Sequence, residues 1–267
     1  MNFADRYGPW AVVAGASEGT GREFARQIAA SGVSCVLIAR REGLLAELAR
    51  EIRAEYRVEC ITKAIDLSAL DAFERIVATV GSREVGLFVS NAGADPNGAL
   101  FLDRDVKAWS DLIQVNVMTK VLCCHHFGGL MRTRGKGGFL LVNSGACYSG
   151  VSYLTTYSAS KAFVLNFAEG LWAELRHHGV DVLTLVLGQT DTPAYRKYCA
   201  DHGTPFPDNA ASPKEVARVG LDRLPYGPIW NWGLADDEAG YAGSSASARR
   251  AKAIAMDEIM RQTLGTK

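Results

Sequence analysis

Apolar runs rich in β-branched residues alternate with longer segments of helical period from residue 10 to about residue 190. This alternation is typical of repeated strand–helix units, which build a parallel sheet with helices on both faces. The apolar runs do not alternate strictly with polar residues, as expected for strands buried on both sides. We therefore expect an α/β fold with one doubly wound sheet. The predicted strands are 10–14, 33–39, 60–65, 85–90, 139–143 and 180–187, and the predicted helices are 20–31, 42–56, 70–80, 106–134 and 155–178.

The chain beyond Gly188 is less regular. A long, partly aromatic loop is expected there, followed by a helix that starts at Ser212-Pro213 and ends at Arg223, because proline suits the first turn of a helix. Residues 226–233 are predicted as a last strand and residues 248–263 as a terminal helix. No linker interrupts the strand–helix pattern, so residues 1–267 are expected to form one domain.

Charge and composition exclude several classes of function. The 29 lysines and arginines balance the 29 aspartates and glutamates, so no overall positive field attracts nucleic acid. No stretch reaches the ~18 apolar residues of a membrane span, and the first residues show no basic segment followed by an apolar one, so we expect a cytoplasmic protein. The six cysteines form no CxxC pair, and His125 and His126 point about 100° apart on a helix, so no metal site is expected.

A glycine-rich segment, Gly15–Gly21, joins the first predicted strand directly to the first helix. Without β-carbons the backbone can approach a diphosphate closely, and the helix N-terminus supplies free N–H groups and a partial positive charge. A tight turn without a ligand is the alternative. The setting between strand and helix favours a dinucleotide site, whose expected contacts are Gly15, Ser17, Glu18, Gly19, Thr20 and Gly21.

The end of the second strand usually decides which dinucleotide is bound, because an acidic side chain there accepts hydrogen bonds from the adenosine ribose. Ala39, Arg40 and Arg41 stand at this place, and guanidinium groups suit a phosphate. We therefore expect NADP(H) as the preferred cofactor, with NAD(H) possible. Glu18 would repel the 2′-phosphate unless it points outward, and the two arginines could instead be the solvated start of a helix.

The ends of the third and fourth strands supply further expected contacts to the dinucleotide. Asp66 and Leu67 follow the third strand, and Asn91, Ala92 and Gly93 follow the fourth. Asp66 could hydrogen-bond to the adenine, but it could equally cap the next helix. These segments lie at the carboxyl ends of parallel strands, where open α/β sheets bind ligands.

Tyr157 and Lys161 lie four residues apart on a predicted helix, so their side chains share one face at about 5 to 6 Å. Such a pair also arises by chance, but Ser144 at the end of the fifth strand and Asn116 in the long helix are its expected neighbours. A phenol with an ordinary pKa of about 10 exchanges protons poorly at neutral pH. Lys161 should lower that pKa, and together with the charge of a bound nicotinamide it could bring it to around 7. We predict that Tyr157 exchanges a proton with a carbonyl or hydroxyl oxygen to which Ser144 also hydrogen-bonds.

The order of these motifs resembles the short-chain dehydrogenase/reductase family, in its compact single-domain branch. The resemblance covers residues 10–192 and rests on the glycine loop, the Asn-Ala-Gly turn, Asn116, Ser144, Tyr157, Lys161 and Gly188–Thr192. Three positions depart from the family pattern. Ala14, Ser90 and Leu187 stand where the family usually has Thr, Asn and Pro.

The resemblance implies a Rossmann fold and a set of roles. It implies a cofactor-binding half at about 8–136, a catalytic and substrate-binding part at about 137–233 and a C-terminal extension at about 234–267. The implied catalytic residues are Asn116, Ser144, Tyr157 and Lys161, where Lys161 also holds the nicotinamide ribose and Asn116 positions a water. Gly188, Thr190 and Thr192 are further implied cofactor contacts, and the long helices imply a homodimer or homotetramer.

The substrate is expected between these landmarks, where the side chains are mostly aromatic and aliphatic. The candidate substrate-lining residues are Asp95, Cys147, Tyr148, Leu154, Gln189, Tyr195 and Tyr198, with Phe206 nearby. Such a wall favours a mostly apolar ketone or secondary alcohol, although an aromatic cluster is often only core. A 3-oxoacyl thioester reductase and a non-catalytic dinucleotide-binding redox sensor stay open as alternatives.

Overall fold

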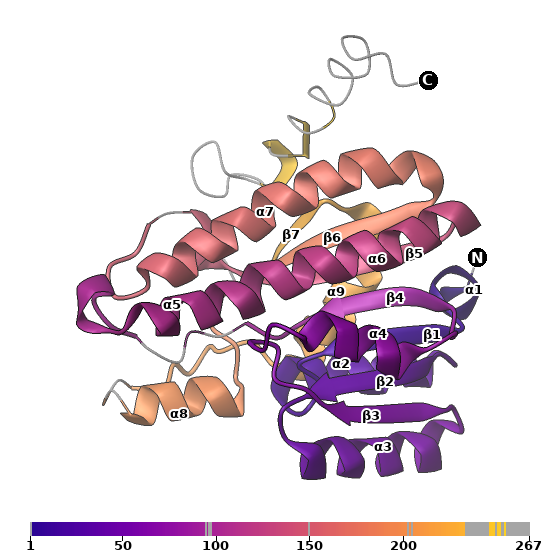
Figure 1. Cartoon of the computed structure of the whole chain (residues 1–267), viewed down its shortest axis with the longest axis horizontal. Coiled ribbons are helices and arrows are strands. Elements are labelled where there is room, and N and C mark those ends of the chain that lie inside the picture. The colour runs from indigo at the N-terminus through magenta and orange to yellow at the C-terminus, as the bar shows by residue number, and fades with distance from the viewer. Residues whose placement is uncertain are drawn as a thin grey trace.

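Seven parallel strands form one sheet in the order β3-β2-β1-β4-β5-β6-β7 (Figure 1). The computed structural model describes residues 2–93, 95, 98–148, 150–201, 203, 205–232, 246–248, 250–251 and 254. The order reverses between β1 and β4, the topological switch point of a Rossmann fold. The strands are β1 (Trp10–Ala14), β2 (Ser34–Ala39), β3 (Cys60–Ala64), β4 (Val85–Ser90), β5 (Gly137–Ser144), β6 (Val180–Leu187) and β7 (Ile229–Trp232).

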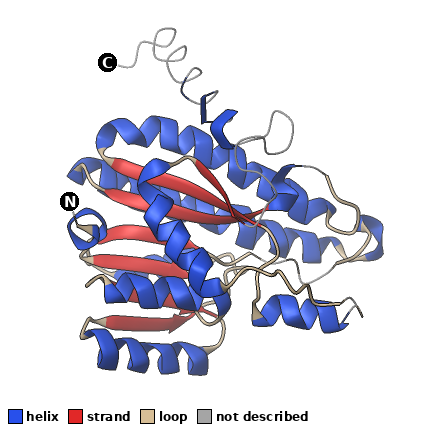
Figure 2. Ribbon diagram, turned by 180° about the vertical axis from the view of Figure 1, so that it is seen from behind, coloured by secondary structure: helices blue, strands red, loops and turns tan. Residues whose placement is uncertain are grey.

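Helices cover both faces of this sheet (Figure 2). Successive strand residues face opposite cores: Val13 packs in the cluster that contains Phe24 of α2, whereas Val12 packs in the cluster that contains Phe127 of α6. The helices are α1 (Phe3–Tyr7), α2 (Gly19–Ala30), α3 (Glu42–Tyr56), α4 (Ala72–Val80), α5 (Val106–Ile113), α6 (Thr119–Arg134), α7 (Thr155–Leu175), α8 (Pro193–Asp201) and α9 (Pro213–Arg223). None of the helices in the described ranges is long and apolar enough to cross a bilayer.

The predicted fold class and strands are confirmed, and the helices need three corrections. The predicted helix 106–134 is interrupted by a π-helical turn, η2 (Gln114–Met118), between α5 and α6. The loop predicted after Gly188 contains α8, and the N-terminal α1 was not predicted. Most of the predicted terminal helix 248–263 lies outside the described residues, of which 246–248, 250, 251 and 254 are helical.

The short helix α1 lies at the amino ends of the strands, opposite the glycine loop. The buried phenol of Tyr7 donates a hydrogen bond to Oδ2 of Asp181 on β6 at 2.7 Å, and Arg6 forms an ion pair with the same carboxylate at 2.6 Å. The Tyr7 ring packs so closely on β5 that a β-carbon at Gly138 would lie 2.9 Å from Cε1 of the ring. The first residues of the chain are thus tied to the second half of the sheet.

Candidate active site

Most of the expected site residues lie at or just beyond the carboxyl ends of the strands. The glycine loop follows β1, and the turn 91–93 follows β4 on the neighbouring strand. Nδ2 of Asn91 donates to the carbonyl oxygen of Gly15 at 3.0 Å, and the backbone N–H groups of Asn91 and Ala92 both donate to Ala14. These bonds hold the two loops together at the switch point, where doubly wound sheets bind dinucleotides.

The glycines of the loop are required by close contacts. A β-carbon at Gly15, whose φ is 86°, would lie 2.6 Å from the backbone nitrogen of Ala92. A β-carbon at Gly21 would lie 2.0 Å from the carbonyl oxygen of Gly15. The loop therefore leaves its backbone accessible at the glycines, and it leads into the N-terminus of the twelve-residue helix α2. Accessible backbone and free helix N–H groups fit a diphosphate.

Glu18 is paired with an arginine at the end of β2. Its carboxylate accepts an ion pair from Arg41 at 2.6 Å, and Arg41 also donates to Oγ of Ser17 at 3.2 Å. Arg40 is exposed beside this pair. The negative charge that conflicts with an NADP phosphate is thus compensated by a guanidinium in the same loop cluster.

Asp66 caps the turn after β3. The backbone N–H and the hydroxyl of Ser68 donate to its Oδ1 at 3.0 and 2.8 Å. The backbone hydrogen bond from Ser68 is the main cause that lowers the pKa of the Asp66 carboxyl, with smaller contributions from the Ser68 hydroxyl and the charge of Arg40. Asp66 therefore closes a local turn and does not cap the next helix, α4, whose N-cap is Asp71, and Oδ2 of Asp66 lies outside these two bonds. The backbone carbonyl of Leu67 accepts from Thr119 at 3.0 Å.

Tyr157, Ser144 and Lys161 come together between β5 and α7. The hydroxyl of Ser144, the last residue of β5, lies beside the phenol of Tyr157 on the first turn of α7 and acts to lower the pKa of that phenol. Nζ of Lys161, a residue that is 3% exposed, lies 5.3 Å from the centre of the Tyr157 ring. Asn143 fixes this arrangement, since its Nδ2 donates to the carbonyl of Lys161 at 3.1 Å and its Oδ1 accepts from the N–H of Ser144 at 2.9 Å.

Asn116 lies in the middle of the π turn and is fully buried. Its Oδ1 lies 2.1 Å from the point that a β-carbon at Gly93 would occupy, and Nζ of Lys161 lies 3.2 Å from the same point. Neither polar atom of the Asn116 amide has a hydrogen-bond partner within the described part of the chain. A π turn adds one residue to the helix and often marks a functional site, and here it brings a polar amide close to Lys161.

The protein groups alone do not lower the pKa of Tyr157, a lowering that was predicted for Lys161 together with a bound nicotinamide. Burial raises the pKa of Tyr157 above its ordinary value, and the Ser144 hydrogen bond only partly opposes this increase. Burial and then the charge of Lys120 lower the pKa of Lys161 far below its ordinary value. The expected lowering of the Tyr157 pKa is therefore not produced by the protein groups alone, and the buried Lys120 was missed because a lysine on a helix usually faces solvent.

The expected substrate-lining residues form two groups. Asp95 and Cys147 lie near the phenol of Tyr157, since both contribute to its raised pKa. Leu154 immediately precedes α7. Tyr148 instead donates its phenol to Oδ1 of Asn231 on β7 at 2.6 Å, so that hydroxyl is already bound.

The second group is aromatic and lies on and after α8. The ring centres of Tyr195 and Tyr198 are 6.4 Å apart, and Phe206 lies 5.7 Å from Tyr195. The Gln189 side chain lies near the Tyr195 phenol, whose pKa it acts to lower. Thr192 contacts the glycine loop, because a β-carbon at Gly19 would lie 2.9 Å from its Cγ2, and the remaining cofactor candidates Gly188 and Thr190 connect β6 to this segment.

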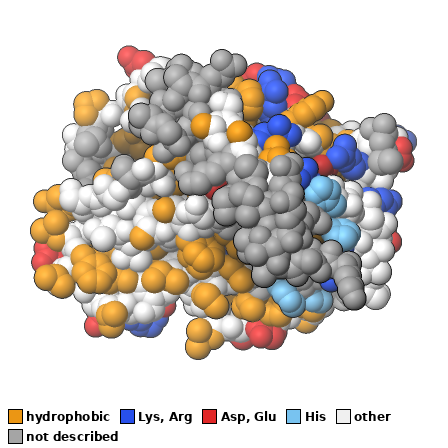
Figure 3. Space-filling view, turned by 90° about the horizontal axis from the view of Figure 1, so that it is seen from above, with side chains coloured by type: hydrophobic (Ala, Val, Ile, Leu, Met, Phe, Trp, Pro, Cys, Tyr) orange, Lys and Arg blue, Asp and Glu red, His pale blue; other side chains and the backbone are white. Residues whose placement is uncertain are grey.

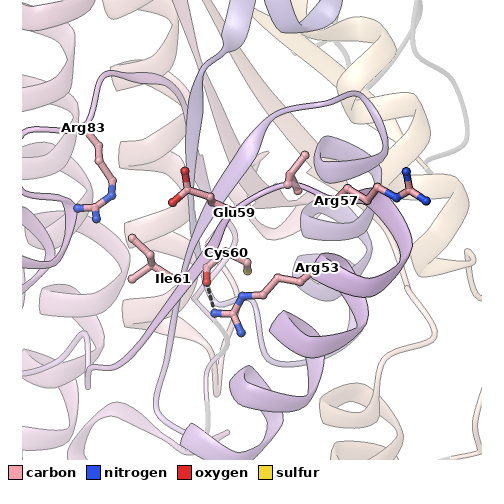
Figure 4. A pocket seen from close by; sticks show the side chains of 7 residues that line it. Arg53, Arg57, Glu59, Cys60, Ile61 and Arg83 are labelled. Carbon is pink, nitrogen blue, oxygen red and sulfur yellow. Dashed lines mark hydrogen bonds between the residues drawn. The ribbon is translucent and has the colours of Figure 1, made fainter.

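A shallow hollow at the other end of β3 does not bring chemical groups together (Figure 4). Arg53 donates to the carbonyl of Cys60, while Arg57 and Arg83 point away in different directions. Three guanidiniums that do not converge offer no anion site. No cluster of three potential metal ligands occurs in the described ranges either.

Comparisons with known proteins agree with this geometry. A family model described as short chain dehydrogenase matches residues 9–202. The chain is 30% identical over 228 residues to a 7beta-hydroxysteroid dehydrogenase of Clostridium sardiniense, an alignment that covers 84% of this chain and 85% of that relative. It is 37% identical over 183 residues to a very-long-chain 3-oxoacyl-CoA reductase of Laccaria bicolor, covering 67% of this chain and 54% of that relative.

A solved structure from a study of 7beta-hydroxysteroid dehydrogenase stereoselectivity has a TM-score of 0.83 and 28% sequence identity to this chain, and the match covers 97% of this chain and 100% of that one. The fold, the glycine loop and the Ser-Tyr-Lys arrangement thus occur in a chain that matches the family over most of its length. The chain belongs to the short-chain dehydrogenase/reductase family and is an oxidoreductase that acts on CH–OH or carbonyl groups.

Proposed function

We propose that the protein is an NADP(H)-dependent oxidoreductase that interconverts a mostly apolar ketone and its secondary alcohol, with Tyr157 as the proton-transfer group. The observation that carries this proposal is that the Tyr157 phenol lies beside the Ser144 hydroxyl, with Nζ of the buried Lys161 5.3 Å from the centre of the same ring. These groups lie beyond the strand ends that also carry the glycine loop.

Each residue has a distinct task in this proposal. Tyr157 gives its phenolic proton to the carbonyl oxygen during reduction and takes the hydroxyl proton during oxidation. Ser144 donates a hydrogen bond to the same oxygen, and Lys161 stabilises the phenolate form of Tyr157. Asn116 places its buried amide beside Lys161, where it can orient a polar partner of the ammonium. The nicotinamide ring, when bound, supplies or accepts the hydride.

The preference for NADP(H) is supported by charge at the end of β2. Ala39 leaves no carboxylate there for the ribose hydroxyls, and Arg40 is exposed beside the loop. The ion pair with Arg41 compensates the charge of Glu18, so the loop presents little net repulsion to a 2′-phosphate. Arg40 is the residue that we expect to contact the phosphate directly.

The substrate class is supported by the wall of the site and by the lengths of the relatives. The aromatic group Tyr195, Tyr198 and Phe206 suits a flat, apolar molecule such as a fused-ring hydroxysteroid or its ketone. The alignment also covers 85% of the hydroxysteroid dehydrogenase but only 54% of the 3-oxoacyl-CoA reductase. A 3-oxoacyl thioester is the second candidate substrate because of that relative.

The test is an activity assay in which the purified protein is mixed with fused-ring ketones, simple ketones or 3-oxoacyl thioesters, each with NADPH and with NADH. The absorbance of the reduced nicotinamide measures turnover. We expect the highest kcat/KM with a fused-ring ketone and NADPH. The variant Tyr157→Phe should lose at least about 10²-fold in kcat while binding NADPH as tightly as the wild type, and Tyr56→Phe on α3 serves as its control. A Tyr157→Phe variant that keeps full turnover would contradict the mechanism, and a preference for thioesters would replace the substrate class.

A further inference from the structure

A second lysine, Lys120, lies buried beside the catalytic group without a role in the proposed mechanism. It is 2% exposed, and its Nζ donates to the carbonyl oxygen of Ala92 at 3.3 Å. Within the described ranges, the ionisable groups that act on its charge are the thiols of Cys124 and Cys123, and no carboxylate is among them. Lys120 is therefore a buried ammonium with a single backbone partner and no ion pair in this part of the chain.

Lys120 and Lys161 contact the same short turn. Lys120 binds the carbonyl of Ala92, and Nζ of Lys161 lies 3.2 Å from the point that a β-carbon at Gly93 would occupy. After burial, the charge of Lys120 is the largest cause of the lowered pKa of Lys161. Burial lowers the pKa of Lys120 itself to about 8, so this side chain is largely protonated at neutral pH.

A buried ammonium without a carboxylate is unfavourable for folding, because the charge loses its hydration and gains little in return. Methionine has nearly the same length and would fill this place between α6 and the turn without that loss. Groups that reduce stability in this way are typical of functional sites, where the charge itself is needed.

We infer that Lys120 is a positioning residue of the catalytic site, whose charge acts through space on Lys161 and Tyr157 and whose hydrogen bond holds the turn 91–93 against them. This inference rests on the proposed function of Tyr157 and Lys161. A nearby positive charge makes protonation of a second amine harder, so it lowers the pKa of that amine. It also makes ionisation of a phenol easier, so it lowers the pKa of the phenol. Removing the charge of Lys120 must therefore move the titration of both groups to higher pH.

The other titratable groups around the two ammoniums do not compensate this charge. Cys123 and Cys124 lie on the same helix, and burial raises the pKa of both thiols, to about 12 for Cys123, so both are neutral at pH 7. Cys147 acts on Lys161 and on Tyr157 from the turn after β5. The carboxylate of Asp95 acts on Tyr157 and opposes its ionisation.

The experiment measures kcat/KM for alcohol oxidation against pH in the wild type, Lys120→Met and Lys120→Gln. Glutamine keeps an N–H donor for Ala92 but carries no charge. We expect the ascending limb of the profile to move up by about one pH unit in both variants, from the Coulomb interaction of two close charges. Below that limb the rate should fall about tenfold. The same change at an exposed lysine, Lys214→Met on α9, should leave the profile unchanged.

Two further measurements separate this role from a structural one and from the proposed chemistry. Thermal unfolding should show Lys120→Met to be at least as stable as the wild type, since an unpaired buried charge is removed. In a protein with isotope-labelled lysine, the signal that disappears in Lys161→Met identifies Lys161, and its titration should move to higher pH in Lys120→Met. This titration needs no turnover, so it tests the inference even if the proposed reaction fails.

The inference would be overturned if the pKa of Lys161 were the same in Lys120→Met as in the wild type. It would also be overturned if kcat/KM fell by the same factor at every pH and the ascending limb stayed where it is in the wild type. A normal limb in Lys120→Gln together with a shifted limb in Lys120→Met would show that the hydrogen bond to Ala92 acts instead of the charge, and would also overturn it. A shifted titration without turnover on any substrate would support the inference and count against the proposed reaction alone.

Discussion

Single residues at the end of β2 set the expected choice of dinucleotide. Arg41 forms an ion pair with Glu18, whereas the neighbouring Arg40 is exposed directly after β2. A hydrogen bond between charged groups contributes about 1.5–3 kcal/mol, which is roughly 10- to 100-fold in affinity. We expect Arg40→Ala to raise the KM for NADPH by about this factor and to change the KM for NADH little, as measured by initial rates with each cofactor.

Arg50→Ala offers the matched control for this substitution, since Arg50 is an exposed arginine on α3, ten residues further along the chain. It should change neither KM. An equal increase in both KM values for Arg40→Ala would mean that Arg40 supports a part common to the two cofactors, and the 2′-phosphate would have to be bound elsewhere.

The raised pKa of Tyr157 predicts opposite pH dependence for the two directions of the reaction. Reduction needs the protonated phenol and oxidation needs the phenolate. Because burial favours the neutral phenol, reduction should be nearly constant across neutral pH, whereas oxidation should rise as pH increases into the alkaline range. Profiles of kcat/KM in both directions measure this, and an oxidation rate that declines above neutral pH would contradict it.

The sequence was sufficient to predict that Tyr157, Lys161 and Ser144 lie together but not to describe their charges. Tyr157, Lys161 and Ser144 were predicted together because helical spacing and strand ends are local properties. The pKa of Tyr157 and the burial of Lys120 depend on packing between distant elements, so no local pattern contains them. The pairing of Glu18 with Arg41 likewise joins two loops that only the fold brings together.

At the scale of elements, the short helix α1 is expected to stabilise the sheet without touching the reaction. The phenol of Tyr7 is the buried donor to Asp181, and burial raises the pKa of that carboxyl despite the ion pair with Arg6. Tyr7→Phe removes this donor and should lower the free energy of unfolding by about 1–3 kcal/mol, as measured by denaturant unfolding. The kcat should stay at the wild-type value, and Tyr226→Phe, at a tyrosine that is 67% exposed, should change neither quantity.

A Tyr7→Phe variant that loses kcat as well as stability would show that α1 also shapes the site.

The elements themselves were predicted unevenly. The helix α3 was predicted well, because its buried side is apolar along its whole length, and α7 was predicted from a long segment without proline although its first buried residues are polar. The π turn at 114–118 was not predicted, since a single added residue hardly changes the period, and α8 was hidden because Pro193 and its aromatic residues resemble a loop.

The whole molecule presents a face that a second copy of the chain could cover. Ile113, Met118, Leu130 and Phe163 on α5, η2, α6 and α7 are each 42% to 47% exposed. The view from above shows many hydrophobic side chains at the surface, and the front view shows these long helices lying side by side (Figures 1 and 3). Exposed apolar patches of this kind mark association surfaces, and the family resemblance implies a homodimer or homotetramer. We expect the wild type to associate in light-scattering measurements.

Phe163 is the position at which that association can be tested. Its ring stacks on Phe167 of the same helix at 5.8 Å, so both rings present one apolar surface. Burying a carboxylate there without a partner is costly, so Phe163→Asp should give a monomer at concentrations at which the wild type is assembled. Leu70→Asp, at a leucine that is 85% exposed before α4, is the control and should stay assembled. A wild type that remains monomeric, or a Phe163→Asp variant that assembles normally, would mean that this helical face serves another contact.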